Sequence, residues 1–505
     1  MTFQPEFHKI NSGDRIQLPK YSEIVTFKMS DTLEKGIGNI IAKTCNICVT
    51  SFEAQEKAVA YEGGILCTVA FIDLEGAQRT MTYKGVISGK ISAEFVKPTS
   101  FISLKSEILD CSVEDVKGSV ASMAVAYQIG GACVNESVTD VLVGGEGIFV
   151  ETDDGDFTNK TLSKSAQFQL ESTESIKQNV SLVLSCYGSV IVENVNIGEK
   201  IAVVDGVLKT YVTYMTAEAD SRINTEVFDI PFHEEFELEQ AKIGMTGTAN
   251  VSCCDVGVTA YSDENKKMTR FEIAAHCVSS ICAFAADECE FATEVFSCEN
   301  ELLVTRNSLN TFVYKGRSSY PLDEKLVFTL DEEYERVESV ISASVEMIDS
   351  FCKDEKIFAN GILKASVLMY GEEGYKLNDF EMPISYEMQY DDCGGVEVDA
   401  CMTPMNVTAR LKLSNELELF GKINVNLDIF EKNTFAVITE LELGEEKPQA
   451  YSAIVVYVGE VGDSVMDVAR KLNVMPKIIE AQNKELTFPL NKGDKVVIYR
   501  QKKVN

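Results

Sequence analysis

The sequence has few residues that could carry catalysis. It holds three histidines among 505 residues, and no serine nucleophile elbow or glycine-rich phosphate loop stands between a strand and a helix. The adjacent pair His276-Cys277 lies in an apolar, strand-like run. Neighbours in a strand point to opposite faces, so the pair cannot act as base and nucleophile. We therefore expect no enzymatic activity and no cofactor.

Long apolar runs and an excess of basic residues are also missing. No apolar stretch is long enough to span a bilayer, and residues 1–19 carry charges without an apolar core, so we expect an N-terminal tail and no signal peptide. The formal net charge of −33 argues against nucleic-acid partners and membrane insertion. These features predict a cytoplasmic protein.

Regular cysteine spacing is missing too. The 15 cysteines are an odd number, and Cys45-x-x-Cys48 is the only CxxC motif. Neither this pair nor Cys253-Cys254 has the further ligands that a zinc site needs. Buried free thiols in a reducing compartment are the expectation. The acidic run 151–156 lacks the calcium-binding loop pattern, and its Gly155 suits a hairpin turn equally well, so a metal at the acidic loops stays an open alternative.

The C-terminal residues show the clearest local pattern. Residues 455–458 suit a strand, and Gly462-Asp463 is a turn signal. Ser464 is a good N-cap, with an acidic residue three positions later, and an apolar face follows at helical spacing. Pro476 suits the first position of a second helix. Residues 495–499 close the segment, which gives the order strand, helix, helix, strand.

This segment, residues 449–500, resembles a LysM domain. Such modules usually bind N-acetylglucosamine polymers, partly through the turn before the first helix, and Met466 stands where an aromatic residue is often found. This departure favours a protein partner, with peptidoglycan as the alternative. The resemblance and the exposed basic and apolar residues predict this ligand or partner surface: Gly462, Asp463, Ser464, Val465, Met466, Arg470, Lys471, Lys477, Asn483, Lys484, Glu485 and Leu486.

Three earlier segments share a pattern of Glu-Lys, a short apolar strand, a glycine turn and a second apolar strand. The glycine turns are expected at Gly63-Gly64, Asp205-Gly206 and Asn360-Gly361. Possible helix starts precede the three segments at Asp31, Thr173 and Asp331. Aromatic strands follow them, marked by Tyr83 with Ile87, Phe228 with Phe232, and Phe380 with Ile384. The spacing makes each unit the size of a domain.

The rest of each unit is rich in strand patterns. In residues 407–413, alternation places Leu411 and Leu413 in a core and Arg410 and Lys412 in solvent. We expect a mainly β protein of three tandem antiparallel β-sandwich-like repeats, followed by the small α/β (βααβ) LysM domain. The expected boundaries are residues 20–165, 166–310 and 311–446 for the repeats.

Repeated β domains that end in one LysM module resemble the spore-coat morphogenetic proteins of endospore-forming Firmicutes, which carry SPOCS domains. The resemblance implies a non-enzymatic scaffold for coat assembly on the mother-cell side of the forespore surface. In that family, the LysM module docks onto a coat basement-layer protein, and the β-repeats support contacts with other coat proteins. The alternative function is peptidoglycan binding through the LysM module.

Overall fold

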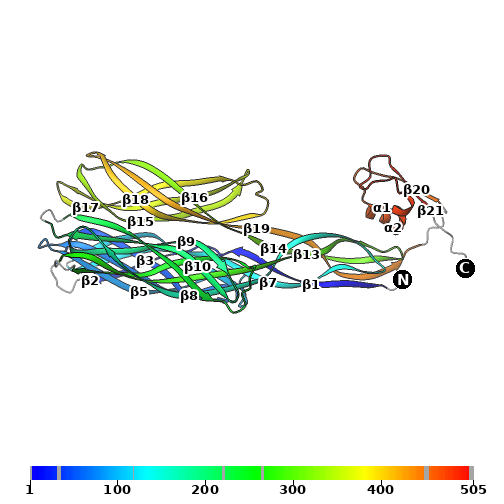
Figure 1. The fold of residues 1–505 in the computed structure, drawn as a ribbon, viewed down its shortest axis with the longest axis horizontal. Coiled ribbons are helices and arrows are strands. Elements are labelled where there is room, and N and C mark those ends of the chain that lie inside the picture. The colour runs from blue at the N-terminus through cyan, green and yellow to red at the C-terminus, as the bar shows by residue number, and fades with distance from the viewer. Residues whose placement is uncertain are drawn as a thin grey trace.

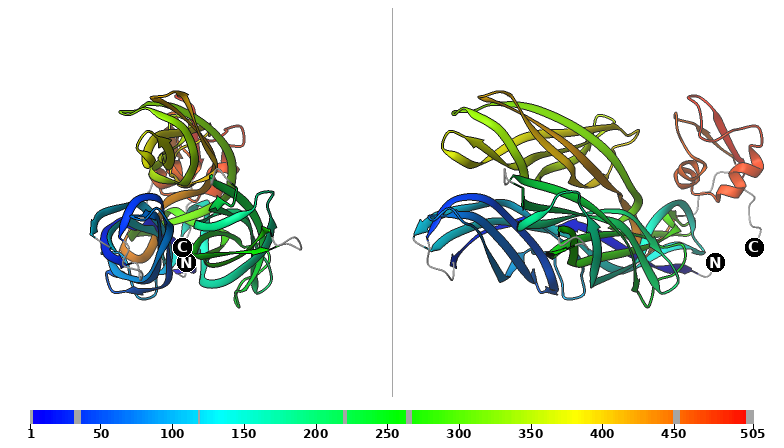
Figure 2. Two further views of the ribbon diagram at one scale, coloured as in Figure 1. Left: turned by 90° about the vertical axis from the view of Figure 1, so that its left-hand side faces the viewer. Right: turned by 60° about the vertical axis from the view of Figure 1, so that its left-hand side comes forward.

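The computed structural model describes residues 3–30, 36–117, 119–218, 222–262, 267–448 and 454–499. Within these residues the chain forms 21 strands and two short helices. Figure 1 and Figure 2 together show three β-rich lobes, a narrower stalk of long strands that leaves them, and a small module at the far end of the stalk. The expectation of a mainly β, antiparallel protein is confirmed.

The first lobe packs two sheets face to face. One has the order β3-β4-β5, and the other has the order β1-β7-β2 with β6 paired to β7. Their facing side chains, such as Val59 and Met123, are fully buried in one core. The strands are β1 (Gln4–Gln17), β2 (Tyr21–Ser30), β3 (Ile37–Gln55), β4 (Ala58–Asp73), β5 (Gln78–Ser92), β6 (Phe101–Lys117) and β7 (Val120–Glu146).

The other two lobes are built in the same way. The second lobe pairs the sheets β11-β10-β9 and β12-β13-β8, and the third pairs β15-β16-β17 and β14-β19-β18. The second lobe contains β8 (Phe149–Ser175), β9 (Val180–Ile197), β10 (Ile201–Thr216), β11 (Ile223–Glu237), β12 (Thr246–Ser262) and β13 (Met268–Phe296). The third contains β14 (Asn300–Thr329), β15 (Tyr334–Lys353), β16 (Lys356–Gly371), β17 (Gly374–Gln389), β18 (Val396–Leu413) and β19 (Glu416–Glu446).

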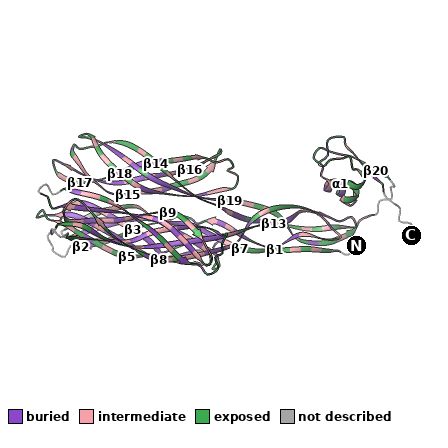
Figure 3. Ribbon diagram, in the orientation of Figure 1, coloured by how far each residue is buried: buried purple, intermediate pink, exposed green. Residues whose placement is uncertain are grey.

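The three lobes surround a common axis, as the end-on view in Figure 2 shows. One strand pair from each lobe runs on into the stalk: β1 with β7, β8 with β13, and β14 with β19. Figure 3 shows buried positions recurring along these strands. One layer of the stalk core takes a single buried residue from each of the six strands: Ile10, Val141, Phe157, Phe291, Leu309 and Val437.

The chain changes lobe at the tip of the stalk, in the turns that join β7 to β8 and β13 to β14. The expected boundaries at residues 165 and 310 therefore fall inside β8 and β14, because each of these strands runs unbroken from the stalk into its lobe. The segment 1–19, expected to be a tail, contributes β1. Its Ile10 and Arg15 are buried, since β7 and the neighbouring lobes cover them.

The turn of each predicted hairpin lies at the Glu-Lys pair and not at the glycine, which corrects the prediction. Lys57, Lys200 and Glu355 hold the positive φ values of these turns, at 61°, 61° and 59°. The glycines lie inside the following strands, where β-bulges draw a neighbouring carbonyl close. A Cβ at Gly361, for example, would lie 2.9 Å from the carbonyl oxygen of Glu346.

The predicted third strands are present, and they match between lobes. Gly63, Gly206 and Gly361 lie opposite the buried residues Ile87, Phe232 and Ile384, respectively. Equivalent places in the three lobes therefore share three features. These are a Glu-Lys turn, a crowded glycine and a buried residue opposite that glycine.

The possible helix starts do not begin helices. Thr173 lies in β8, where pairing with β13 overrides its capping tendency, and Asp331 lies in the bend before β15. Asp31 lies outside the described residues. Gly155 is likewise within β8 and not in a turn. Leu413 is 58% exposed and not in the core, because β18 ends there at a turn.

The cysteines also differ from the expectation of free thiols throughout. Cys48 of the first lobe is joined to Cys254 of the second, and Cys352 is joined to Cys393 within the third. Cys254 occupies a β-bulge in β12, which directs its side chain away from the second lobe's core. The remaining eleven cysteines lie outside these two disulfides.

The C-terminal module has the element order that the sequence pattern predicts. It consists of β20 (Ile454–Val458), α1 (Val465–Leu472), α2 (Pro476–Gln482) and β21 (Lys495–Tyr499). The two strands pair antiparallel. Across the described ranges of the chain, no helix is long and apolar enough to cross a membrane.

Candidate functional site: the C-terminal module and the lobe junction

Helix α1 begins where the capping pattern places it. The Ser464 hydroxyl accepts a hydrogen bond from the backbone N–H of Asp467 at 3.1 Å, and the Asp467 carboxylate accepts one from the Ser464 N–H at 3.0 Å. This reciprocal capping box satisfies two of the free N–H groups at the helix start. The helix ends at Asn473, whose φ of 52° is the left-handed conformation typical of a C-terminal cap.

The side chain of Asn483 links the end of α2 to β21 through hydrogen bonds. Its side-chain amide donates to the carbonyl oxygens of Ile479 and Val497, at 2.9 and 3.0 Å. Its Oδ1 accepts from the Val497 N–H at 2.8 Å. Gln482 makes a similar pair of bonds to the backbone of Tyr499. These side chains satisfy one edge of β21, so their first role is structural.

Asp463 is buried at the turn before α1 and joins three parts of the module. Its carboxylate accepts hydrogen bonds from Lys471 at 2.8 Å, from the Tyr457 hydroxyl at 2.6 Å and from the Glu460 N–H at 3.0 Å. Lys471, followed by Tyr457, lowers the pKa of Asp463 to about 2. Because this lies below the unfolded value of about 3.9, the carboxylate stabilises the module above pH ~4, and the contribution is lost as the pH falls toward 2.

The module is seated on the tip of the stalk. Phe296 at the end of β13 is buried in the module's hydrophobic core together with Met466. Arg470 forms an ion pair with Glu294 of β13 at 2.8 Å. The Asn473 amide donates to the carbonyl oxygen of Cys298 at 2.9 Å. Residues from the stalk therefore complete the core of the module.

The predicted ligand or partner surface is divided by this arrangement. Asp463 and Met466 are buried, and Arg470 faces the stalk. Ser464, Lys471 and Asn483 hold the module's own elements together. Val465 and Leu486 are half-buried against its core. The exposed remainder is Gly462, Lys477, Lys484 and Glu485.

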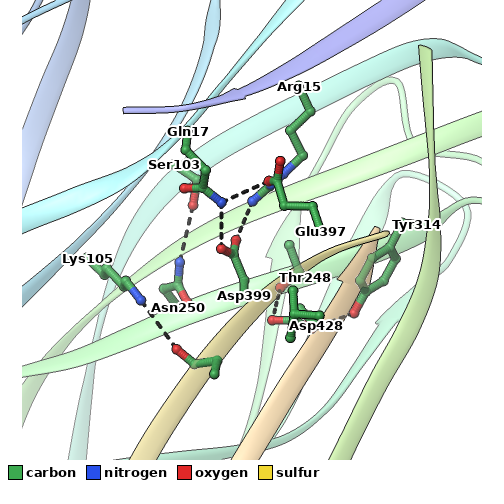
Figure 4. Close-up of polar contacts among 12 residues, drawn as sticks. Arg15, Gln17, Ser103, Lys105, Thr248, Asn250, Tyr314, Glu397, Asp399 and Asp428 are labelled. Atoms are coloured by element: carbon green, nitrogen blue, oxygen red, sulfur yellow. Dashed lines mark hydrogen bonds and ion pairs between the residues drawn. The ribbon is translucent and has the colours of Figure 1, made fainter. Parts of the chain in front are cut away.

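A second polar site lies where the lobes meet (Figure 4). Arg15 on β1 is 4% exposed and pairs with Glu397 and Asp399 of the third lobe. Gln17 donates to the same Asp399 at 2.7 Å. Across from them, Asp428 accepts hydrogen bonds from three side chains of the second and third lobes, which are Thr248 at 3.0 Å, Tyr314 at 2.7 Å and Arg317 at 2.6 Å. We call these residues the junction cluster.

The charges of the junction cluster stabilise one another. Burial disfavours the Asp399 carboxylate, but the charges of Arg15 and Lys105 outweigh it and hold its pKa below the usual range. Burial also opposes the charge on Arg317, and Asp428 more than compensates, which raises the pKa of Arg317. Asp399 and Arg317 are therefore held in their charged forms, and the cluster joins the lobes through paired charges.

Sequence patterns did not reveal the junction cluster. Arg15 and Asp399 are 384 positions apart, and no local motif surrounds either residue. The one available signal is Arg15 itself, a basic residue that Ile16 and Leu18 follow in a segment predicted to be a tail.

A cavity of about 280 Å³ lies beside the cluster and is lined by strands of all three lobes. Its lysines are engaged in contacts between lobes. Lys43 pairs with Asp379 at 2.7 Å, and Lys364 donates to the carbonyl oxygen of Leu109 at 2.6 Å. Among the residues that the structure describes, no group of three or more His, Cys, Asp or Glu side chains is arranged to hold a metal ion.

A comparison with protein families finds one similarity. Residues 179–260 match the family described as SipL, SPOCS domain. The matched segment covers all of β9, β10 and β11 and most of β12, so it contains the second lobe's Glu-Lys turn and its crowded Gly206. No curated protein matches the chain.

Proposed function

We propose that the protein is a non-enzymatic scaffold of the bacterial endospore coat. The observation that carries the proposal is the match of residues 179–260 to the SPOCS domain family. The first and third lobes repeat the turn, glycine and strand arrangement of that matched segment, which supports assigning the same domain type to all three. Side chains that cross between lobes suit a rigid spacer better than an enzyme whose domains open and close.

In this proposal the C-terminal module is a LysM domain that docks onto a coat basement-layer protein. The partner would meet the exposed part of the predicted surface, which includes Lys477 and Lys484. Exposed charges at the rim of an interface mainly raise the association rate. The protein would then act at the forespore surface on the mother-cell side, with the lobes available to other coat proteins.

Deletion of the gene in a sporulating host tests the proposal. The coat should detach from the forespore in the deletion strain, as electron microscopy of the sporangia would show. Reintroduced wild-type protein should restore attachment. A coat that stays attached in the deletion strain would refute the scaffold role.

The docking surface is tested by charge reversal in the full-length chain. Lys477→Glu should weaken capture of the basement-layer protein, whereas the exposed Lys492→Glu on the loop before β21 serves as the matched control. Lys471→Glu is unsuitable because Lys471 holds Asp463 and Tyr457. Equal capture by both variants would place the interface elsewhere.

Sedimentation with insoluble peptidoglycan tests the alternative. The full-length chain is required, because Phe296 of the stalk contributes to the module's core. We expect no retention at low salt, since Met466 is buried against that core and is not available to stack on a sugar. Retention that the addition of soluble N-acetylglucosamine oligomers abolishes would favour glycan binding.

A further inference from the structure

The CxxC motif of β3 is divided between the two faces of one strand. Cys45 and Cys48 are three positions apart, so their side chains point in opposite directions. Cys48 forms the disulfide with Cys254 of the second lobe. Cys45 packs against the core of the first lobe. The two cysteines therefore do not form a redox pair with each other.

The neighbouring residues of β3 show the same alternation. Asn46 faces the second lobe, where its side-chain amide donates to the carbonyl oxygens of Gly188 and Cys253, both at 3.2 Å. Ile47 and Val49 belong to the first lobe's core. Cys45 shares the orientation of Ile47 and Val49, so its thiol is available only to partners within its own lobe and to the cavity beside it.

Two further thiols lie next to Cys45. Its Sγ is 2.6 Å from the Sγ of Cys67 and 3.1 Å from that of Cys111. Cys67 lies directly opposite Cys45 in the pairing of β3 with β4. Cys111 comes from β6, which belongs to the facing sheet. Cys45 is thus the shared neighbour of one thiol in its own sheet and one in the other.

The three thiols differ in access. Cys45 and Cys111 are half-buried and line the cavity of about 280 Å³ at the lobe junction. Cys67 is fully buried and does not line this cavity. Burial, together with the two neighbouring thiols, raises the pKa of Cys45 well above its ordinary value. A small oxidant that enters the cavity can reach the sulfurs of both Cys45 and Cys111, because both line it.

We propose that this three-thiol cluster is an oxidation site that forms a third disulfide, centred on Cys45. A peroxide transfers one oxygen to the Cys111 sulfur, which gives a sulfenic acid and one water. The Cys45 sulfur then attacks the Cys111 sulfur, the S–S bond forms, and the second water leaves with the proton of Cys45. Two thiols and one hydrogen peroxide thus yield one disulfide and two waters. Attack of the Cys67 thiol on Cys45 then exchanges the bond and restores the Cys111 thiol, without further oxidant.

The consequence concerns β3. Through Cys48 this strand is already joined to the second lobe. Oxidation at Cys45 would join it also to β4 or, across the core, to β6. Strand β3 would then carry two covalent links. Cys45 would provide the link within the first lobe, and Cys48 provides the link to the second lobe.

The test uses the full-length protein, treated with hydrogen peroxide and then with an alkylating reagent. Free thiols should fall by two per chain, and mass spectrometry of tryptic peptides should show Cys45 linked to Cys111 and to Cys67. Cys45 and Cys48 share the tryptic peptide 44–57, so fragmentation between them must locate the bond. Detection of Cys45 with a free thiol after the loss of two other thiols would overturn the proposal.

Single substitutions separate the roles. Cys45→Ser should abolish both links, Cys67→Ser should leave only the link to Cys111, and Cys111→Ser should leave the link to Cys67 but slow its formation. Cys289→Ser, at a half-buried free thiol of the stalk, is the matched control and should change nothing. A Cys67–Cys111 link formed at an undiminished rate in Cys45→Ser would also overturn the proposal. If Cys45→Ser does not fold, the disulfides mapped in the oxidised wild-type protein test the proposal.

Discussion

The three-lobed body and the C-terminal module are held together over very different distances in the sequence. In the module, the capping box joins residues three positions apart, and the side chains of Asp463 and Lys471 bond across eight positions. In the body, Arg15 pairs with Asp399 across 384 positions, and Thr248 bonds to Asp428 across 180. Contacts between residues close in sequence can be recognised as a motif, whereas contacts between lobes cannot.

The difference has a physical consequence for stability. Removing a contact in the module should affect that module first, because its bonds are short in sequence and largely its own. Removing a contact in the junction cluster should loosen two or three lobes together, because each of its residues has partners in another lobe. Hydrogen exchange resolved by peptide distinguishes local loosening from loosening of several lobes.

The largest effect is expected for Asp428→Ala. The change leaves the guanidinium of Arg317, which is almost fully buried, without its carboxylate, and breaking such a pair costs about 3–5 kcal/mol. Urea unfolding should show the loss, and exchange should rise in both the second and third lobes. Glu387→Ala breaks the exposed pair with Lys356 and is the control, with an expected cost of about 0–1 kcal/mol. Equal losses in the two variants would contradict the role of the junction cluster.

The next effect is expected for Gly63→Ala. A Cβ at this position would overlap the carbonyl oxygen of Cys48 on the neighbouring strand, and such overpacking typically costs about 1–3 kcal/mol. Gly144→Ala is the control, because a Cβ there meets nothing within 4 Å. Thermal unfolding should separate the two variants. A Gly63→Ala protein as stable as Gly144→Ala would show that the bulge relaxes freely.

A smaller effect is expected for Ser464→Ala in the module. The loss of the helix N-cap costs about 1 kcal/mol, and exchange should rise in α1 while the three lobes stay unchanged. Thr487→Ala, at an exposed position of the same module, should have no effect. Raised exchange throughout the body would mean that the module and the lobes unfold as one unit.

The smallest effect is expected for Glu294→Gln on the stalk. Its carboxylate pairs with Arg470 of the module and Arg306 of β14 at half-exposed positions, where ion pairs contribute about 0–1 kcal/mol. Exchange in α1 should rise slightly at low salt, and the difference should vanish at high salt because ions screen exposed pairs. A difference that persists at high salt would indicate a role beyond the ion pair.

The sequence predicted the local structure of the module closely. Ser464 and Pro476 begin the two helices as expected, because capping depends on residues within one turn. It did not predict that Met466 and Arg470 face the stalk, since no motif encodes which surface of a module meets another part of the chain. Six of the residues predicted for the partner surface are exposed, but two of these, Arg470 and Lys471, pair with Glu294 of the stalk and Asp463 of the module.

In the body, the sequence predicted strands but misplaced their turns. Asp205-Gly206 and Asn360-Gly361 have the composition of two-residue turns, yet they lie inside β10 and β16. Glycine is needed there because a bulged neighbour approaches too closely for a Cβ, and composition alone cannot separate that cause from a turn. The role of β1 was missed for a related reason, because its pairing partner begins more than a hundred residues later.

The position of β1 also has a consequence for synthesis. It leaves the ribosome before its partner β7, which begins only at residue 120, and long before Glu397 and Asp399 of the third lobe. Domains usually fold one after another as they emerge. Here β1 obtains its last partners only when the third lobe is complete. Until Glu397 and Asp399 are made, Arg15 lacks its carboxylates, so the contacts of β1 cannot be completed lobe by lobe.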